Sequence, residues 1–378
     1  MRVKVFKDQN VYEALQDRLS FIFSEFDSIY IAFSGGKDSG ALLNLVLKYK
    51  YEHEIKKKLG LFHQDFEAQY EKTTEFVTRT FENITDDVEP YWVCLPMASK
   101  TPMSNYETYW YPWDDEKKDV WVRPMPDYPN VINMYNNPFG FYKYKMRQED
   151  LYKRFNEWYG NTHGGKTVCL IGMRADESLN RYSAIINKKN DYKGKKWITK
   201  NFKDVWTASP LYDWTAQDIW TANGKFGFDY NKLYDLFYKA GLPMHQMRVG
   251  SPFNEWAVNA LNLYRIIEPK TWAKLVKRVQ GANFGAIYGK TKAMGYKGMS
   301  LPPGHTWESY AKFLLATLPK NAQANYKKRS VSPDGVVNWK NICLCILKND
   351  HRCRFASPSR EKYKEGKLSS VKEKYKSL

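Results

Sequence analysis

The sequence has little that would suit a membrane or an oxidising compartment. Its 378 residues contain no uninterrupted apolar run near the roughly 18 residues that a membrane-spanning helix needs. The first residues, MRVKVFKDQN, lack the apolar core of a signal peptide. Only five cysteines are present, an odd number that argues against a disulfide framework. These features predict a cytoplasmic protein with reduced thiols and no membrane association.

Two common nucleotide-binding patterns are also missing. The nearest approach to a Walker P-loop, GAIYGKT at residues 285–291, is one residue too short between its glycines and follows a basic helical segment, not a strand. A dinucleotide fingerprint is absent because the turn SGGKDSG at residues 34–40 lacks the required glycine spacing. Any nucleotide site must therefore be of another kind.

Length and net charge limit the number of domains and the class of binding partner. A chain of this length can form one large α/β domain with an added module or two domains, and we expect two. The 59 lysines and arginines outnumber the 41 aspartates and glutamates, which gives a formal net charge of +18. This excess favours a polyanion, a nucleotide or an acidic protein surface as the partner. Charge alone does not choose among them.

Short apolar segments alternate with helical patterns over the first part of the chain. Helical periodicity follows the first segment at residues 41–49 and the second up to about Phe81. The alternation predicts an α/β fold with a doubly wound, mostly parallel sheet, whose ligands sit beyond the C-terminal ends of the strands. The expected strands are residues 29–33 and the apolar parts of LGLFHQDF (59–66), EPYWVCLP (89–96) and KTVCLIGMR (166–174).

Residues 97–150 break this alternation, because prolines fall there among many tyrosines and tryptophans. The stretch is too aromatic for a disordered linker, so we expect an irregular insertion that packs over the sheet edge or the ligand. We divide the chain into a nucleotide-binding domain, residues 1–250, and a basic, mainly helical C-terminal domain, residues 251–378, with a mobile tail from about residue 360. In the latter, PKTWAKLVKRVQ predicts an amphipathic helix whose exposed face carries Lys270, Lys274, Lys277 and Arg278.

The turn after the first strand has the features of a phosphate site. Its glycine pair, Gly35 and Gly36, lets backbone N–H groups approach a ligand, and the following helix offers its positive end. Hydroxyl, ammonium and carboxylate groups come from Ser34, Ser39, Lys37 and Asp38. The carboxylate can cap the helix or hold a metal ion. The alternative is an ordinary glycine-containing turn between a strand and a helix.

The motif SGGKDS resembles the PP-loop of the adenine-nucleotide α-hydrolase superfamily, in its phosphoadenylyl-sulfate reductase-like branch. Three further segments agree in order: FHQD at 62–65, IGMRADESLNR at 171–181 and SPLYDWTAQDIW at 209–220. The resemblance covers about residues 29–240 and implies a HUP-like fold with ATP and Mg²⁺ as ligands. In the last segment, Thr215 and Asp218 form the pattern of a helix cap, so its role is structural.

The resemblance assigns roles to residues of these segments. It implies that the β- and γ-phosphates are held by Ser34, Gly35, Gly36, Lys37 and Ser39, with Asp38 turned toward the loop or Mg²⁺. It also implies that Arg174 and Arg181 face phosphates or an anionic co-substrate. Both arginines follow a predicted strand end, and a guanidinium binds phosphate oxygens in pairs.

Four side chains keep more than one interpretation. The alternative for Arg174 and Arg181 is a surface ion pair with Asp176 or Glu177. Asp65, at the end of the second strand, is a Mg²⁺ ligand, a partner of a ribose hydroxyl or only a cap of the next helix. His63 is the nearest candidate for a general base by position, and otherwise a hydrogen-bonded structural group.

ATP-using members of the superfamily attack the α-phosphate and expel pyrophosphate. The resemblance therefore implies a Mg²⁺-dependent ATP α-phosphate hydrolase or adenylyl transferase that activates a regulatory or nucleic-acid-linked target. Members that reduce phosphoadenylyl sulfate use a C-terminal cysteine, and the corresponding stretch AGLPMHQMRVGSPF (240–253) has none. A reductase or sulfur-transfer enzyme is thus the first alternative, and a regulator that senses ATP without turning it over is the second.

The end of the chain offers a possible metal site and a second resemblance. Cys343, Cys345 and Cys353 lie near His351 and can bind zinc or an iron–sulfur cluster, although ICLCIL reads equally as a buried strand. NWKNICLCILKND resembles a domain of unknown function in bacterial regulators of immunoglobulin-binding genes, which commonly accompany a ParB-like partner. With the basic helix and the aromatic insertion, this favours binding of DNA or RNA. A solvated basic face and a packed insertion explain the same features.

Overall fold

The computed structural model describes residues 7–103, 109–186, 191–254, 261–283, 301–329, 337–347 and 353. Contacts divide the chain into two units. The first comprises Met1–Ser99, Tyr111–Pro252 and Leu263–Arg278, and the second comprises Lys100–Trp110, Phe253–Asn262 and Val279–Leu378. One segment of the first unit ends at Pro252, close to the boundary expected at residues 250/251, while residues 100–110 group with the second unit and residues 263–278 with the first. The tail expected from residue 360 and the GAIYGKT stretch lie outside the described residues.

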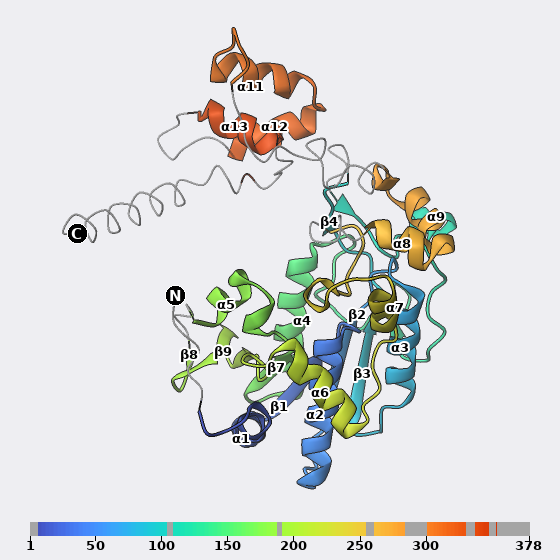
Figure 1. Ribbon diagram of the computed structural model, residues 1–378, viewed down its shortest axis with the longest axis vertical. Coiled ribbons are helices and arrows are strands. Elements are labelled where there is room, and N and C mark those ends of the chain that lie inside the picture. The colour runs from blue at the N-terminus through green and yellow to red at the C-terminus, as the bar shows by residue number, and fades with distance from the viewer. Residues whose placement is uncertain are drawn as a thin grey trace, which may run out of the picture. The chain divides into compact units, whose positions relative to one another are not determined.

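The first unit is built on an eight-stranded sheet (Figure 1). Its strands are β1 (Ser28–Ala32), β2 (Leu59–Gln64), β3 (Val88–Val93), β6 (Val131–Ile132), β7 (Thr167–Ile171), β8 (Asp191–Tyr192), β9 (Lys195–Phe202) and β10 (Val205–Ala208). They lie in the order β6-β3-β2-β1-β7-β10-β9-β8, and all neighbours from β6 to β10 are parallel. Only β9 and β8 run antiparallel to their neighbours. The predicted mostly parallel α/β sheet is confirmed.

Helices cover both faces of this sheet. One core contains side chains of α1 (Val11–Glu25), α2 (Lys37–Glu52), α3 (Glu71–Glu82) and α6 (Ala216–Phe226), and the other contains those of α4 (Gln148–His163). The separation follows from the alternation of side chains along each strand, since Ile29 and Ile31 enter the first core and Tyr30 the second. Further helical segments are α5 (Leu179–Ile186), α7 (Leu233–Lys239), α8 (Leu261–Ile267), α9 (Pro269–Arg278), η1 (Asp115–Val120), η2 (Ala175–Glu177) and η3 (Met244–Gln246).

The chain changes direction across the sheet between β1 and β7. From β1 it proceeds to β2 and β3 on one side, whereas β7 pairs with β1 on the other side. The C-terminal ends of β1 and β7 therefore open a crevice, the usual ligand position in such sheets. Gly172 follows β7 directly, and a Cβ there would lie 2.8 Å from the Asp38 carbonyl group. Glycine thus allows the end of β7 to contact the first turn of α2.

The aromatic insertion packs at the edge of the sheet. Its strand β6 pairs with β3 and becomes the edge strand on that side. Trp113 is almost fully buried in the larger core, and the side chains of Trp121 and Tyr128 pack against the same core. The high aromatic content of this stretch is therefore explained by packing.

A buried ion pair ties the insertion and α9 to the end of β2. Glu67 has no exposed surface and a φ of 62°, and its carboxylate accepts the backbone N–H groups of Trp113 and Val122 at 2.8 and 3.0 Å. Arg278 donates to the same carboxylate at 2.7 and 2.9 Å. Four donors thus converge on one buried side chain.

The amphipathic helix expected near residue 270 is confirmed as α9, with one correction. Lys270, Lys274 and Lys277 are exposed as expected. Arg278 is only 5% exposed and faces Glu67, so its placement on the exposed basic face was wrong. The pattern of apolar residues locates the helix. It does not reveal that Arg278, the last residue of the helix, pairs with a buried carboxylate.

The second unit is mainly helical in its described part. Its helices are α11 (Trp307–Ala316), α12 (Lys320–Arg329) and α13 (Trp339–Leu347), and they share a small apolar core. A separate two-stranded sheet joins β4 (Ser99–Lys100) to β5 (Tyr109–Trp110). Among the described residues, no helix combines the length and the apolar character that crossing a membrane requires.

Replacing Arg278 by alanine should lower the free energy of unfolding by about 3–5 kcal/mol, because it leaves the Glu67 carboxylate buried without its countercharge. The exposed neighbour Lys277 is the matched control, and Lys277→Ala should change this free energy by less than about 0.5 kcal/mol. Urea unfolding of both variants measures the difference. Equal stability of the two variants would contradict the assigned ion pair.

Candidate functional site

Hydrogen bonds between Ser34 and Ser39 stabilise the turn between β1 and α2. Gly35 has a φ of +72°, and a Cβ there would come within 3.0 Å of Val77 and 3.1 Å of Thr73, so glycine is required. The Ser39 hydroxyl accepts the Ser34 N–H at 3.1 Å and donates to the Gly36 carbonyl at 3.1 Å. Ser39 therefore shapes the turn, and the N–H groups of the first turn of α2 face its mouth.

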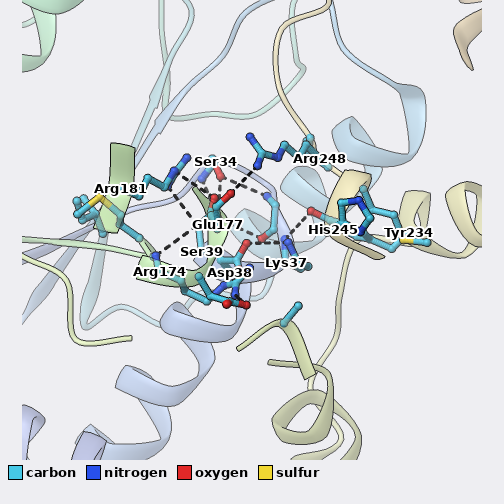
Figure 2. Close-up of a pocket in the computed structure, with 18 of the residues that line it drawn as sticks. Ser34, Lys37, Asp38, Ser39, Arg174, Glu177, Arg181, Tyr234, His245 and Arg248 are labelled. Atoms are coloured by element: carbon cyan, nitrogen blue, oxygen red, sulfur yellow. Dashed lines mark hydrogen bonds and ion pairs between the residues drawn. The ribbon is translucent and has the colours of Figure 1, made fainter. Parts of the chain in front are cut away.

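Asp38 lies between two buried cations. One carboxylate oxygen accepts from Lys37 Nζ at 2.9 Å, and the other accepts from Arg174 Nε at 2.6 Å. Lys37 is 7% exposed and Arg174 is 3% exposed, so each buried charge needs a nearby carboxylate, and Arg174 also has Asp176 at 3.8 Å. The arrangement joins the first turn of α2 to the segment after β7 (Figure 2).

The described residues do not build a metal site of their own. Both oxygens of Asp38 are engaged by cations, which conflicts with its predicted role as a Mg²⁺ ligand. No group of three histidine, cysteine, aspartate or glutamate side chains suited to a metal ion occurs in the described part of the chain. Mg²⁺ bound to a nucleotide keeps several waters and needs only one or two carboxylates, so the ion remains a prediction that depends on the nucleotide.

Glu177 positions three arginines. Its carboxylate accepts the backbone N–H of Arg174 at 3.3 Å and forms an ion pair with Arg181 at 3.2 Å. Its backbone carbonyl accepts from Arg248 at 2.9 Å. The ion pair given as the alternative for Arg181 is therefore present, and the same guanidinium still lines the cavity described next.

These groups surround a cavity of about 330 Å³ at the ends of β1 and β7. Figure 2 shows Arg181 and Arg248 on either side of Glu177, apart from Lys37 and Asp38. The structure thus brings seven of the predicted residues to one cavity wall, namely Ser34, Gly36, Lys37, Asp38, Ser39, Arg174 and Arg181. Gly35 lies behind this wall, against α3. The cavity combines fixed cations with the N-terminal end of α2, which suits an anion.

A second cavity, of about 410 Å³, adjoins the first. Both are lined by Ala32, Ser34, Ile171 and Val249. The second is mainly apolar, with aromatic walls from Tyr30, Phe33, Phe62, Phe66, Tyr152 and Phe155, the imidazole of His63, and amides from Gln64, Gln69 and Asn156. A flat ring with a few polar edges fits such a surface.

Several residues of the first cavity escaped the sequence analysis. Tyr234, His245 and Arg248 line it from segments that carry no recognisable motif. Glu177 was considered only as a surface ion-pair partner. The one available signal was that Glu177 lies within the segment IGMRADESLNR, which follows β7.

Asp65 does not line either cavity. It is fully buried at the end of β2, where its carboxylate binds Arg123 and accepts from the Trp92 indole N–H at 2.9 Å. Burial alone would raise the pKa of this carboxyl, but the charge of Arg123 holds the pKa below its ordinary value. The prediction of Asp65 as a nucleotide or Mg²⁺ ligand was therefore wrong, because the insertion supplies its countercharge.

His63 is almost fully buried at the end of β2. Its ring lies against Phe33, Phe81 and Trp92 on the face of β2 that enters the larger core, and its Nδ1 pairs with the Phe33 carbonyl at 2.8 Å. Burial lowers the pKa of this imidazole. The ring also lines the second cavity, so the general-base interpretation stays a prediction.

The three C-terminal cysteines form part of an apolar core. Cys343 and Cys345 lie on α13, so the interpretation as a buried strand was wrong. Both, with Cys353, pack among Ala311, Leu315, Tyr326 and Ile342. Burial raises the pKa of the Cys343 thiol to about 11. The described residues hold no group of side chains suited to a metal ion here, and His351 lies outside them, so the zinc or iron–sulfur site stays a prediction.

Comparisons with known proteins agree with this geometry. A family model described as the phosphoadenosine phosphosulfate reductase domain matches residues 28–240, and one described as a domain of unknown function, DUF3440, matches residues 241–334. The chain is also 31% identical to the uncharacterized protein YbdN of Escherichia coli (strain K12), over 94% of this chain and 92% of that protein. The HUP-like fold expected from the sequence agrees with the first match and with the sheet order.

Solved structures show a more distant likeness. The FMN adenylyltransferase of Candida glabrata, in complex with FMN and an ATP analogue, is 14% identical over 61% of this chain and 62% of that chain, with a TM-score of 0.35. The phosphoadenylyl-sulfate reductase of Candida auris is 14% identical over 66% and 97%, with a TM-score of 0.34. The tRNA thiolase NcsA of Methanococcus maripaludis is 12% identical over 78% and 84%, with a TM-score of 0.35. These likenesses concern the fold alone.

The buried imidazole predicts a specific pH dependence of stability. Because the pKa of His63 is lowered by folding, its contribution is complete above the unfolded pKa of about 6.5 and is lost as the pH falls below that value. Between pH 7.5 and 5.5 the wild type should lose up to about 1.4 kcal/mol more than His63→Gln. Urea unfolding at both pH values measures this. The exposed His53→Gln is the control, and an identical pH response in both variants would refute the assignment.

Proposed function

Because the chain belongs to the phosphoadenosine phosphosulfate reductase domain family, we propose that it binds ATP at the turn of residues 34–39 and acts on the α-phosphate. The observation that carries this proposal is the glycine turn at the start of α2, with Lys37 and Arg174 fixed beside it at the reversal of strand order. A nucleophile would bond to the α-phosphorus while the bond to the bridging oxygen breaks. Pyrophosphate would leave with the electron pair of that bond.

The two adjoining cavities support an extended nucleotide. The first offers cations and backbone amides for the phosphate chain, and the second offers aromatic walls for the base. Their shared residues Ser34 and Val249 would lie beside the middle of the ligand. The enzyme would therefore be an ATP pyrophosphatase or an adenylyl transferase.

The cations are placed to stabilise a leaving pyrophosphate. Asp38 holds Lys37 and Arg174 in position without occupying the mouth of the turn. Donors that are fixed before the reaction need no reorganisation when charge develops, which is the main source of electrostatic catalysis. The predicted Mg²⁺ would enter with the nucleotide and screen its phosphates.

A thiol-dependent reduction finds less support. No cysteine lines the first cavity among the described residues. Cys169 lines the second, but burial raises the pKa of its thiol to about 12, and the thiolate is the nucleophilic form. The remaining alternative is a regulator that binds ATP without turnover, a role that the resemblance to immunoglobulin-binding regulators and their ParB-like partner also favours.

Nucleic acid is a candidate for the activated target. Lys270, Lys274 and Lys277 form an exposed row along one side of α9, at spacings of three and four residues. Such a row follows a phosphate backbone without base contacts. None of the three lysines lines either cavity, so target binding and nucleotide binding can be tested separately.

Incubation with ATP labelled at the α or the γ position should release labelled AMP or adenylate and labelled pyrophosphate, respectively. Lys37→Ala should weaken ATP binding at least 10-fold, because a charged phosphate contact is worth about 1.5–3 kcal/mol. Lys48→Ala, further along α2, is the control and should bind like the wild type. Release of ADP and phosphate would refute α-phosphate chemistry, and binding without turnover would favour the ATP-sensing regulator.

Combined replacement of Lys270, Lys274 and Lys277 by alanine should abolish DNA or RNA binding at moderate salt. The slope of log affinity against log salt concentration should fall by about 3 in magnitude, because three phosphate contacts are lost. A triple variant of the exposed lysines Lys153, Lys203 and Lys239 removes the same charge elsewhere and serves as the control. Equal effects of the two variants would mean that only net charge matters.

A further inference from the structure

The hydroxyl of Tyr234 reaches the start of α2 from a distant segment. Tyr234 belongs to α7, is 4% exposed and lines the first cavity. Its oxygen accepts the backbone N–H of Lys37 at 3.0 Å, and its ring lies 5.5 Å from Lys37 Nζ. The oxygen is also 3.5 Å from the place where a Cβ on Gly36 would stand. It therefore sits at the mouth of the phosphate turn.

The proton of this hydroxyl is available to a ligand. A phenol can donate one hydrogen bond as well as accept others, and here the oxygen accepts from Lys37. Within the described part of the chain, the hydroxyl proton has no acceptor. Burial raises the pKa of Tyr234 well above its ordinary value, so the group keeps its proton at any physiological pH.

A neighbouring asparagine fixes the segment that carries the tyrosine. Asn231 is fully buried, and its amide donates to the Gly35 carbonyl at 2.9 Å and to the Thr73 hydroxyl at 3.0 Å. Its side-chain oxygen accepts the Leu233 N–H at 2.9 Å. Residues 231–234 thus contact the turn at two points, the Gly35 carbonyl and the Lys37 amide.

We propose that the Tyr234 hydroxyl donates a hydrogen bond to the phosphate chain bound at this turn, and so acts as a further substrate-positioning group. The inference rests on the proposed nucleotide site. The amide of Lys37 polarises the hydroxyl that it binds, and such a chain of hydrogen bonds strengthens the last donor. The other side chains proposed to contact the phosphates are charged. A neutral hydroxyl would orient the phosphate chain more specifically, because its hydrogen bond is favourable only near one direction.

The test compares Tyr234→Phe with Tyr238→Phe by calorimetric titration with inorganic pyrophosphate and with ATP. Tyr238 lies on the same helix, is 77% exposed and does not line the cavity, so its variant is the control. Phenylalanine keeps the ring contacts of Tyr234 with Trp220 and Phe237. Tyr234→Phe should weaken both ligands by the same factor, about 10-fold or more. The ligand-free variant should still unfold cooperatively but melt slightly lower, because the Lys37 N–H loses the phenol oxygen as its acceptor.

The possible failures are distinguishable. A wild type that binds neither pyrophosphate nor ATP would overturn the nucleotide site and this inference with it. Binding by the wild type with equal affinity in Tyr234→Phe would overturn the inference alone, and tighter binding would mean that the phenol oxygen blocks the Lys37 amide. A loss of affinity in a variant that no longer unfolds cooperatively would reduce Tyr234 to a packing residue.

Discussion

The ion pair between Asp38 and Arg174 is the contact on which the candidate site depends. It joins the first turn of α2 to the segment after β7, two parts of the chain separated by 136 positions. The side chain of Arg174 is buried, and a buried cation without a partner strongly destabilises the fold. The same carboxylate also holds Lys37. Gly172 makes the contact possible, since any larger residue would separate the end of β7 from α2.

The carboxylates after β2 show how the same residue types can serve the fold instead of a ligand. Asp65 and Glu67 follow a strand that ends at the ligand edge of the sheet, which is why Asp65 was expected to bind a nucleotide or Mg²⁺. Each is fully buried and holds one arginine, Arg123 or Arg278, from a later part of the chain. The insertion and α9 are thereby fixed beside the sheet. Asp65 and Glu67 thus fix the surrounding segments in place. Neither residue lines either cavity.

The parts that the sequence predicted correctly are those encoded by contiguous residues. The apolar runs located four strands, and the Thr215 cap with Asp218 is present as expected. The errors concern the partners of a side chain, which only the tertiary fold decides. Tyr234 and Asn231 contact the phosphate turn from about 200 positions away. The apolar run at Cys343 was short enough to suit either a strand or a helix. For the burial of His63 a usable signal existed, since the alternation along β2 places it on the same face as Leu59 and Leu61.

The carboxylates at the first cavity hold its cationic side chains in place but leave some of their hydrogen-bond donors unused. Four cationic side chains line it, namely Lys37, Arg174, Arg181 and Arg248, together with three carboxylates, Asp38, Asp176 and Glu177. Asp38 and Glu177 each bind their cations from one side, so the guanidinium and ammonium groups retain donors for a further anion. An incoming phosphate chain would therefore meet donors whose orientation was fixed during folding. The same arrangement explains why Asp38 is poorly suited to bind a metal ion: a ligand oxygen for Mg²⁺ would have to abandon Lys37 or Arg174, and the buried cation left behind would destabilise the turn itself.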